Sequence, residues 1–112
     1  MISKEQTLKA LKVVMDINRD ETPCNALFNY SGHVEVISIS LYPHGFSKDS
    51  DRWYNFTFHT VSGKDEGYAS VWDGEYMSYD EEPKYDTLDE MLKAIEAIKD
   101  VAKKGVEDGQ TE

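Results

Sequence analysis

The chain has 112 residues, of which 39% are hydrophobic and 30% are charged, and its formal net charge at pH 7 is −10. This length suits one domain with a single core, and its Phe, Tyr and Trp content argues against a wholly disordered chain. A charge of this sign repels phosphate backbones, so we expect no direct binding to nucleic acid.

The negative charge concentrates in the C-terminal part of the chain. Residues 73–112 carry 13 acidic and 5 basic side chains, a net charge of −8, and residues 1–72 contribute the remaining −2. Cys24 is the single cysteine, which excludes an intrachain disulfide. No apolar run is long enough for a signal peptide or a transmembrane span, so we expect a cytoplasmic protein that does not insert into membranes.

The first predicted element is a helix from about Lys4 to Asn18. Ser3 and Gln6 have the spacing of a capping box, in which the two residues satisfy each other's backbone N–H groups. Apolar side chains recur at helical spacing and predict the buried stripe of this helix: Leu8, Leu11, Val14 and Met15. Pro23 disfavours helix at the residue before it and ends the segment.

Alternating apolar and polar residues then predict five strands: Asn25–Tyr30, His33–Tyr42, Arg52–Val61, Tyr68–Trp72 and Glu75–Tyr79. Asp73-Gly74 is typical of a two-residue hairpin, and residues 62–67 are predicted as a turn. In the second strand Val34 and Val36 have the opposite parity to Ile37, which a β-bulge or a strand covered on both faces would reconcile.

The alternation also assigns strand faces. One face of the second and third strands collects the apolar residues Ile37, Ile39, Leu41, Tyr54, Phe56 and Phe58. In the last two strands the hairpin groups Tyr68, Trp72, Met77 and Tyr79 on one side and Ala69, Val71 and Tyr76 on the other. The sequence leaves open which of these two groups faces the core.

A second helix is predicted from about Leu88 to Lys103. Thr87 and Glu90 form another capping-box pattern, and a regular apolar stripe follows it: Leu88, Met91, Leu92, Ile95, Ile98, and Val101 or Ala102. Gly105 suits a helix stop. We therefore expect one domain at residues 1–104 and a flexible tail at residues 105–112.

Together these elements predict a two-layer α+β fold with an N-terminal helix, a mostly antiparallel sheet of about five strands and a C-terminal helix. Each helix has a single apolar stripe, so both are expected on one face of the sheet, where the apolar strand residues lie. The other face would then remain uncovered, with Trp and Tyr side chains among polar ones, a composition typical of binding surfaces.

Candidate partner-binding residues come from this uncovered face and from the acidic connector at residues 80–86. We predict that the following side chains contact a partner: Tyr42, Trp53, His59, Tyr76, Tyr79, Glu81, Glu82 and Tyr85. Carboxylates interleaved with aromatic rings would present a negative and partly apolar surface, which favours a basic partner.

Catalytic and metal-binding patterns are absent from the sequence. The three histidines, His33, His44 and His59, are not spaced as a metal site, and no common nucleophile or nucleotide-binding motif occurs. We therefore expect no catalytic residue, no metal and no cofactor, and no residue roles can be taken from a known family.

The sequence thus favours a small acidic, non-enzymatic protein that binds a protein partner, as an adaptor, an immunity protein or an inhibitor. By analogy of size and charge, one form is a phage or mobile-element protein that occupies the basic nucleic-acid groove of an enzyme. Two alternatives stay open: a homo-oligomer, such as a homodimer, with a structural or accessory role, and a small enzyme or ligand-binding domain with a site near His44 and His59.

Overall fold

The computed structural model describes residues 2–19, 24–31, 35–43, 52–61, 63–79 and 82–109, with backbone only for residues 61 and 103–109. Its helices and strands follow the predicted order: α1 Lys4–Arg19, β1 Asn25–Ser31, β2 Val36–Tyr42, β3 Trp53–Val61, β4 Lys64–Trp72, β5 Met77–Tyr79 and α2 Leu88–Gly109. Each strand pairs antiparallel with the next one along the chain, so the sheet order is β1-β2-β3-β4-β5.

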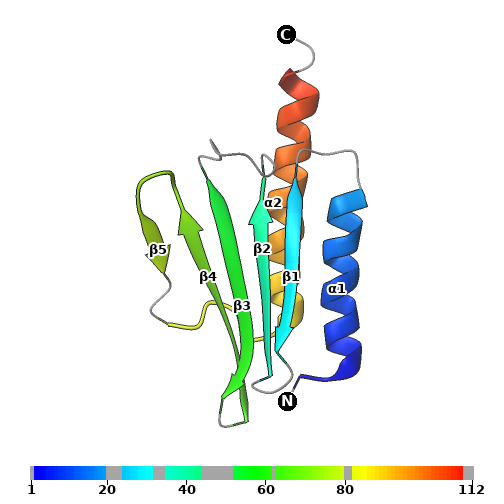
Figure 1. Ribbon diagram of the computed structural model, residues 1–112, viewed down its shortest axis with the longest axis vertical. Coiled ribbons are helices and arrows are strands. Elements are labelled where there is room, and N and C mark those ends of the chain that lie inside the picture. The colour runs from blue at the N-terminus through cyan, green and yellow to red at the C-terminus, as the bar shows by residue number, and fades with distance from the viewer. Residues whose placement is uncertain are drawn as a thin grey trace.

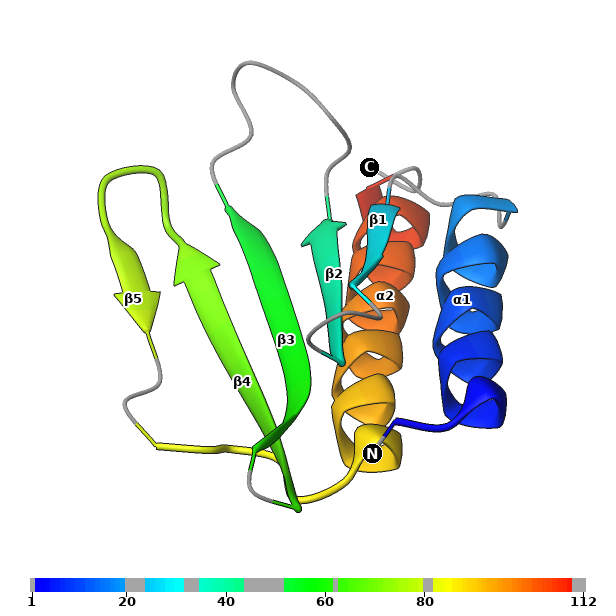
Figure 2. The same ribbon diagram turned by 60° about the horizontal axis from the view of Figure 1, so that its bottom comes forward.

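Both helices lie on the same face of this sheet, as the sequence predicts, and Figures 1 and 2 show the arrangement from two directions. The core lies between the two layers. On the strands it contains the predicted residues Ile37, Ile39, Leu41, Phe56 and Phe58, each at most 1% exposed, with Tyr54 packed beside them. The two-layer α+β prediction is therefore confirmed.

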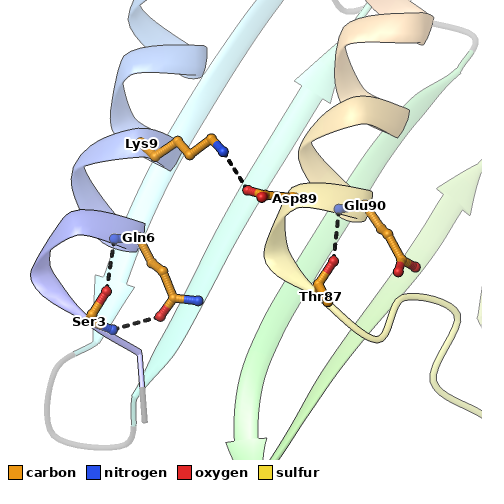
Figure 3. A network of polar contacts seen from close by, with 6 residues as sticks. All are labelled: Ser3, Gln6, Lys9, Thr87, Asp89 and Glu90. Atoms are coloured by element: carbon orange, nitrogen blue, oxygen red, sulfur yellow. Dashed lines mark hydrogen bonds and ion pairs between the residues drawn. The ribbon is translucent and has the colours of Figure 1, made fainter.

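The two helix starts have the predicted caps (Figure 3). The Ser3 hydroxyl accepts a hydrogen bond from the Gln6 N–H at 3.1 Å, and Gln6 Oε1 accepts one from the Ser3 N–H at 2.8 Å. In α2 the Thr87 hydroxyl accepts from the Glu90 N–H at 3.2 Å, whereas the Glu90 carboxylate points away from Thr87. Because each cap satisfies N–H groups that the helix cannot pair, both helices start where the sequence predicts.

Helix α2 buries its predicted stripe. Its core residues are Leu88, Met91, Leu92, Ile95 and Ala102, with Ile98 packed against them, while Val101 is 70% exposed. The predicted end at about Lys103, before Gly105, is wrong, since the helix continues to Gly109. A glycine inside a helix costs only about 1 kcal/mol relative to alanine, so it need not stop one. The flexible tail at residues 105–112 stays a prediction.

Helix α1 buries a different stripe from the one we predict. The residues that face the sheet are Ala10, Val13, Val14 and Ile17. Of the predicted stripe, only Val14 is buried, whereas Leu8 and Met15 are 53% and 41% exposed. Both sets have helical spacing, so the periodicity alone does not select between them. An apolar stripe consequently remains on the outside of α1.

Two turns differ from prediction. Residues 64–67 are strand and not turn, because Val61 pairs with Lys64 and Gly63 takes the left-handed φ of 77° that a tight hairpin needs. The turn after β4 is longer than two residues, since Trp72 pairs with Met77. The partner of Trp72 is therefore two residues later than the predicted Glu75, and a shift of two residues leaves every side chain on its predicted face. Ala69 is 7% exposed, so the group that contains Ala69 and Val71 faces the core.

Strand β2 begins at Val36 and its pairing with β1 and β3 is continuous, so the described strand contains no bulge. Val36 lies on the face opposite Ile37 and is half-buried there. Val34 and His33 lie outside the described residues.

The amide of Asn18 joins α1 to the outer edge of the sheet. Asn18 Oδ1 accepts from the Ala26 N–H at 2.8 Å, and Asn18 Nδ2 donates to the Ala26 carbonyl at 2.9 Å. One side chain therefore pairs both backbone groups that β1 presents at Ala26.

We expect Asn18→Ala to lower the free energy of unfolding by about 1–2 kcal/mol, because two partly buried hydrogen bonds are lost. Urea unfolding measures the loss, and amide exchange of Ala26 should accelerate in the same variant. An unchanged exchange rate at Ala26 would show that Asn18 does not hold this edge in solution.

Candidate functional site

The sheet face opposite the helices is the candidate site, and we call it the open face. No element within the described residues covers it (Figures 1 and 2). The antiparallel register aligns its side chains in rows that run across the strands. These rows differ in chemistry from one end of the strands to the other.

At one end lies an apolar row, formed by Tyr42, Trp53, Trp72 and Met77 of β2 to β5. The rings of Tyr42 and Trp53 stack with centroids 5.6 Å apart, Trp53 pairs with Trp72, and Trp72 pairs with Met77. All four side chains are half-buried by one another and their neighbours. Large, rigid and partly exposed rings of this kind contribute much of the binding energy in protein interfaces.

The centre of the open face is polar and uncharged. Asn55 Oδ1 accepts hydrogen bonds from the Ser38 and Ser40 hydroxyls at 3.1 and 3.4 Å, which links β2 to β3. Thr57 and Ser70 extend this region on β3 and β4. Such groups can exchange hydrogen bonds with a partner backbone without the cost of burying a charge.

At the far end of the open face, His59, Glu66 and Tyr68 form a polar cluster. The buried Nε2 atom of His59 lies 3.5 Å from Glu66 Oε2, and the Tyr68 hydroxyl donates to the same oxygen at 3.0 Å. The His59 and Tyr68 rings meet edge to face at 5.4 Å. The hydrogen bond to the Glu66 carboxylate raises the pKa of Tyr68, because it stabilises the protonated phenol.

Negative charge borders the apolar row at the turn between β4 and β5. Asp73 and Glu75 are exposed there, directly after Trp72. The Asp73 carboxylate accepts from the Tyr76 and Glu75 N–H groups at 2.9 Å each, which lowers the pKa of Asp73. Arg52, next to Trp53, is exposed and close enough to lower that pKa further, so this border carries both signs of charge.

Several predicted partner-binding residues come together on the open face. Tyr42 and Trp53 belong to the apolar row, His59 lies at the opposite end, and Tyr79 is 72% exposed beside Ser70. Tyr76 lies in the turn and is 71% exposed, so it adjoins this face without being part of a strand.

The predicted residues of the acidic connector lie in different surroundings. Glu82 is exposed, and Glu81 lies outside the described residues. Tyr85 belongs to the core instead: it is 9% exposed, its ring lies 6.4 Å from that of Phe56, and its backbone bridges to Gly67 of β4. This packing is possible because β5 covers only the end of β4, so Tyr85 can pair with β4 beyond the end of β5.

Trp72, Met77 and Tyr68 are open-face residues that the predicted set omits. Their shared parity with Tyr79 could be read from the sequence, but the side of the sheet could not, since Ala69 and Val71 are apolar too. The burial of Ala69 shows that Tyr68, Trp72 and Met77 lie on the open face.

The enzyme alternative gains no site within the described residues. His44 lies outside them, and no cluster of three His, Cys, Asp or Glu side chains is found among them. A pocket of about 240 Å³ lies between α1 and α2, lined by Lys9, Val13, Asp89, Leu92, Lys93 and Glu96, on the side of the sheet away from His59. Burial raises the pKa of the Cys24 thiol to about 11, so this group is protonated and unreactive at neutral pH.

Comparison with known proteins adds no relative: no protein-family model, curated protein or solved structure gives a significant match to this chain. Among the described residues, no helix combines the length and apolar character needed to cross a membrane. The case for a function therefore depends on the geometry of the open face.

Proposed function

We propose that this chain is a non-enzymatic protein-binding domain whose open face docks a protein partner. The observation that carries the proposal is the apolar row on a sheet face that no described element covers. Uncharged hydroxyl and amide groups lie on one side of this row and charged groups border it on the other, which matches the apolar patch and polar surroundings of a protein interface. Adaptors, immunity proteins and inhibitors are the classes that fit, with a cytoplasmic location.

Charge favours a basic partner. The chain carries a net charge of −10, and Asp73 and Glu75 place exposed carboxylates beside the apolar row. A partner with lysines or arginines around an apolar pocket would be attracted over a longer range than its contacts reach. The sharper form of the proposal is an inhibitor, encoded by a phage or mobile element, that occupies the basic nucleic-acid groove of an enzyme.

The open face predicts a specific loss of partner binding in the variant W53T/W72T. Threonine keeps a high strand propensity but removes both rings, so the fold should persist while the partner loses its main contacts. We expect affinity to fall at least about 30-fold, or about 2 kcal/mol, as for central aromatic residues of other interfaces. Capture from a lysate of the native host with tagged chain and mass spectrometry identifies the partner, and titration calorimetry measures the loss.

Val101→Thr is the matched control, because Val101 is 70% exposed but lies on α2, on the other side of the sheet. It should leave partner binding within about twofold of the original value. Equal capture by W53T/W72T and the original chain would contradict the proposal. Binding to a basic partner should also weaken as salt rises from about 0.1 to 0.5 M, since exposed charges are then screened.

Self-association through the same face is the second candidate, because the apolar row and the uncharged centre of the open face could stack on those of a second copy. It requires a mass in solution that is a multiple of 12.8 kDa at micromolar concentration. If W53T/W72T converts such a species to the monomer, the open face belongs to a second copy and the hetero-partner proposal is wrong.

A further inference from the structure

The outer edge of β1 is only partly paired. In an antiparallel pair, backbone groups of alternate residues point away from the neighbouring strand. Ala26 is one of these residues, because its N–H and carbonyl bond to the Asn18 side chain and not to β2. Phe28 and Tyr30 have the same parity, so their N–H and carbonyl groups also point outward.

Within the described residues, nothing pairs with these outward groups of Phe28 and Tyr30. β1 is the last strand on this side of the sheet, and Asn18 acts as a substitute for a further strand at one residue only. An unpaired strand edge is a template for another strand, and proteins usually block such edges. In this protein Asn18 blocks the edge at Ala26, and within the described part of the chain the edge at Phe28 and Tyr30 stays open.

Helix α1 provides an apolar surface beside this edge. Asn18 faces the edge, and Leu11 lies seven residues earlier, so it is on the same face of the helix. Leu8 and Met15 continue this surface, 53% and 41% exposed, and we call the three residues the α1 ledge. In both views α1 lies on the outer side of β1, so a strand added to β1 would lie beside α1 (Figures 1 and 2).

The other flank of α1 is occupied by α2. Lys9 Nζ contacts Asp89 Oδ1 at 2.6 Å between the two helices (Figure 3), and Val13 and Leu92 line the pocket there. The α1 ledge lies on the flank away from α2 and is therefore not part of that pocket. A strand that packs on the α1 ledge would bury its apolar side chains and so enlarge the hydrophobic core.

Charge indicates what kind of strand fits. Helix α1 has four basic and two acidic side chains, a net charge of +2, in a chain whose net charge is −10. Lys4 and Arg19, at the two ends of the α1 ledge, pair with no described group. A segment with acidic residues would neutralise them.

A second copy of the chain fits less well. Antiparallel pairing of two β1 edges would bring the two α1 helices together antiparallel, with Lys4 of one helix near Arg19 of the other. It would also join two bodies that each carry −10. Both effects are repulsive, whereas an acidic segment of another protein meets a locally positive helix.

We propose that the free edge of β1 and the α1 ledge bind one extended, acidic segment of a partner protein as a sixth strand. Its backbone pairs with Phe28 and Tyr30, alternate apolar side chains pack on Leu8, Leu11 and Met15, and its carboxylates approach Lys4 and Arg19. This site is separate from the open face and does not depend on the function proposed for it.

The test uses a displayed library of random peptides, selected on the full chain, followed by synthesis of the enriched sequences. Enriched peptides should alternate apolar residues and carry Asp or Glu, and the amide signals of Phe28 and Tyr30 should shift and become protected on binding. N-methylation of alternate peptide amides should reduce affinity at least about tenfold, because it removes the strand pairing but keeps the side chains. A library that yields no binders overturns the proposal.

Two variants locate the site. Tyr30→Pro removes one outward N–H, which an edge strand tolerates, and L8E/M15E places negative charge on exposed positions of the α1 ledge. Each should weaken the selected peptides at least about tenfold, with the circular dichroism spectrum unchanged. Leu27→Ser is the control. Leu27 is on β1 and 52% exposed, but its side chain lies on the open face, so this variant should change peptide affinity less than about twofold.

Peptides that bind Tyr30→Pro and L8E/M15E as tightly as the original chain would overturn the proposal. So would a dimer at micromolar concentration in which the Phe28 and Tyr30 amides are protected from exchange, because a second copy would then occupy the edge.

Discussion

Replacing Phe56 by alanine should lower the free energy of unfolding by about 3–5 kcal/mol. Phe56 is 1% exposed in the central strand β3, between Ile39 of β2 and Ala69 of β4. Its ring lies 6.1 Å from that of Tyr54 and 6.4 Å from that of Tyr85. Removal of the ring leaves a cavity where both layers meet, and domains of this size have only about 5–15 kcal/mol to lose.

Chemical denaturation measures this effect as a lower midpoint at an unchanged slope, since the change in exposed surface should stay the same. Leu27→Ala is the matched control, because Leu27 is a large apolar strand residue that is 52% exposed on the open face. Its cost should stay below about 1 kcal/mol. Equal losses for the two variants would mean that the buried face of the sheet is assigned incorrectly.

Replacing Gly67 by alanine should lower the free energy of unfolding by about 1–3 kcal/mol. This direction is unusual, because glycine usually weakens a strand and its replacement would then be stabilising. An added Cβ would lie 2.9 Å from Tyr85 Cβ and 3.3 Å from Phe58 Cδ2. The Gly67 backbone also accepts from the Lys84 N–H at 2.8 Å and donates to the Tyr85 carbonyl at 2.9 Å. The connector would therefore have to move away and stretch these hydrogen bonds.

A double-mutant cycle tests this explanation. In the background of Tyr85→Gly the two nearest atoms are absent while Phe58 Cδ2 remains at 3.3 Å, so the further change Gly67→Ala should cost about 1 kcal/mol less than in the original chain. The comparison variant Gly63→Ala meets no atom within 4 Å, and its cost of about 1 kcal/mol arises from the positive φ alone. An equal cost of Gly67→Ala in both backgrounds would show that Tyr85 does not pack on Gly67.

The candidate site follows partly from the sequence. Alternation along β3 places Trp53 and His59 opposite Phe56 and Phe58 whatever the rest of the chain does, because strand side chains point to alternate faces. The position of Tyr85 does not follow from the sequence, because a tyrosine in an acidic segment gives no local indication that it pairs with Gly67. The sequence predicts a turn at Gly67 where the structure has a strand, because glycine suits both a turn and a close backbone approach.

Local physics in the sequence determined the element types, their order, the helix starts and the buried face of β2 and β3, because hydrogen-bond caps and side-chain periodicity act within one segment. Only the tertiary structure decided which of two apolar stripes of α1 is buried, which face of β4 lies inward and where Tyr85 packs. Each of these choices compares two locally equivalent arrangements, and contacts with distant segments supply the difference in free energy that selects one of them.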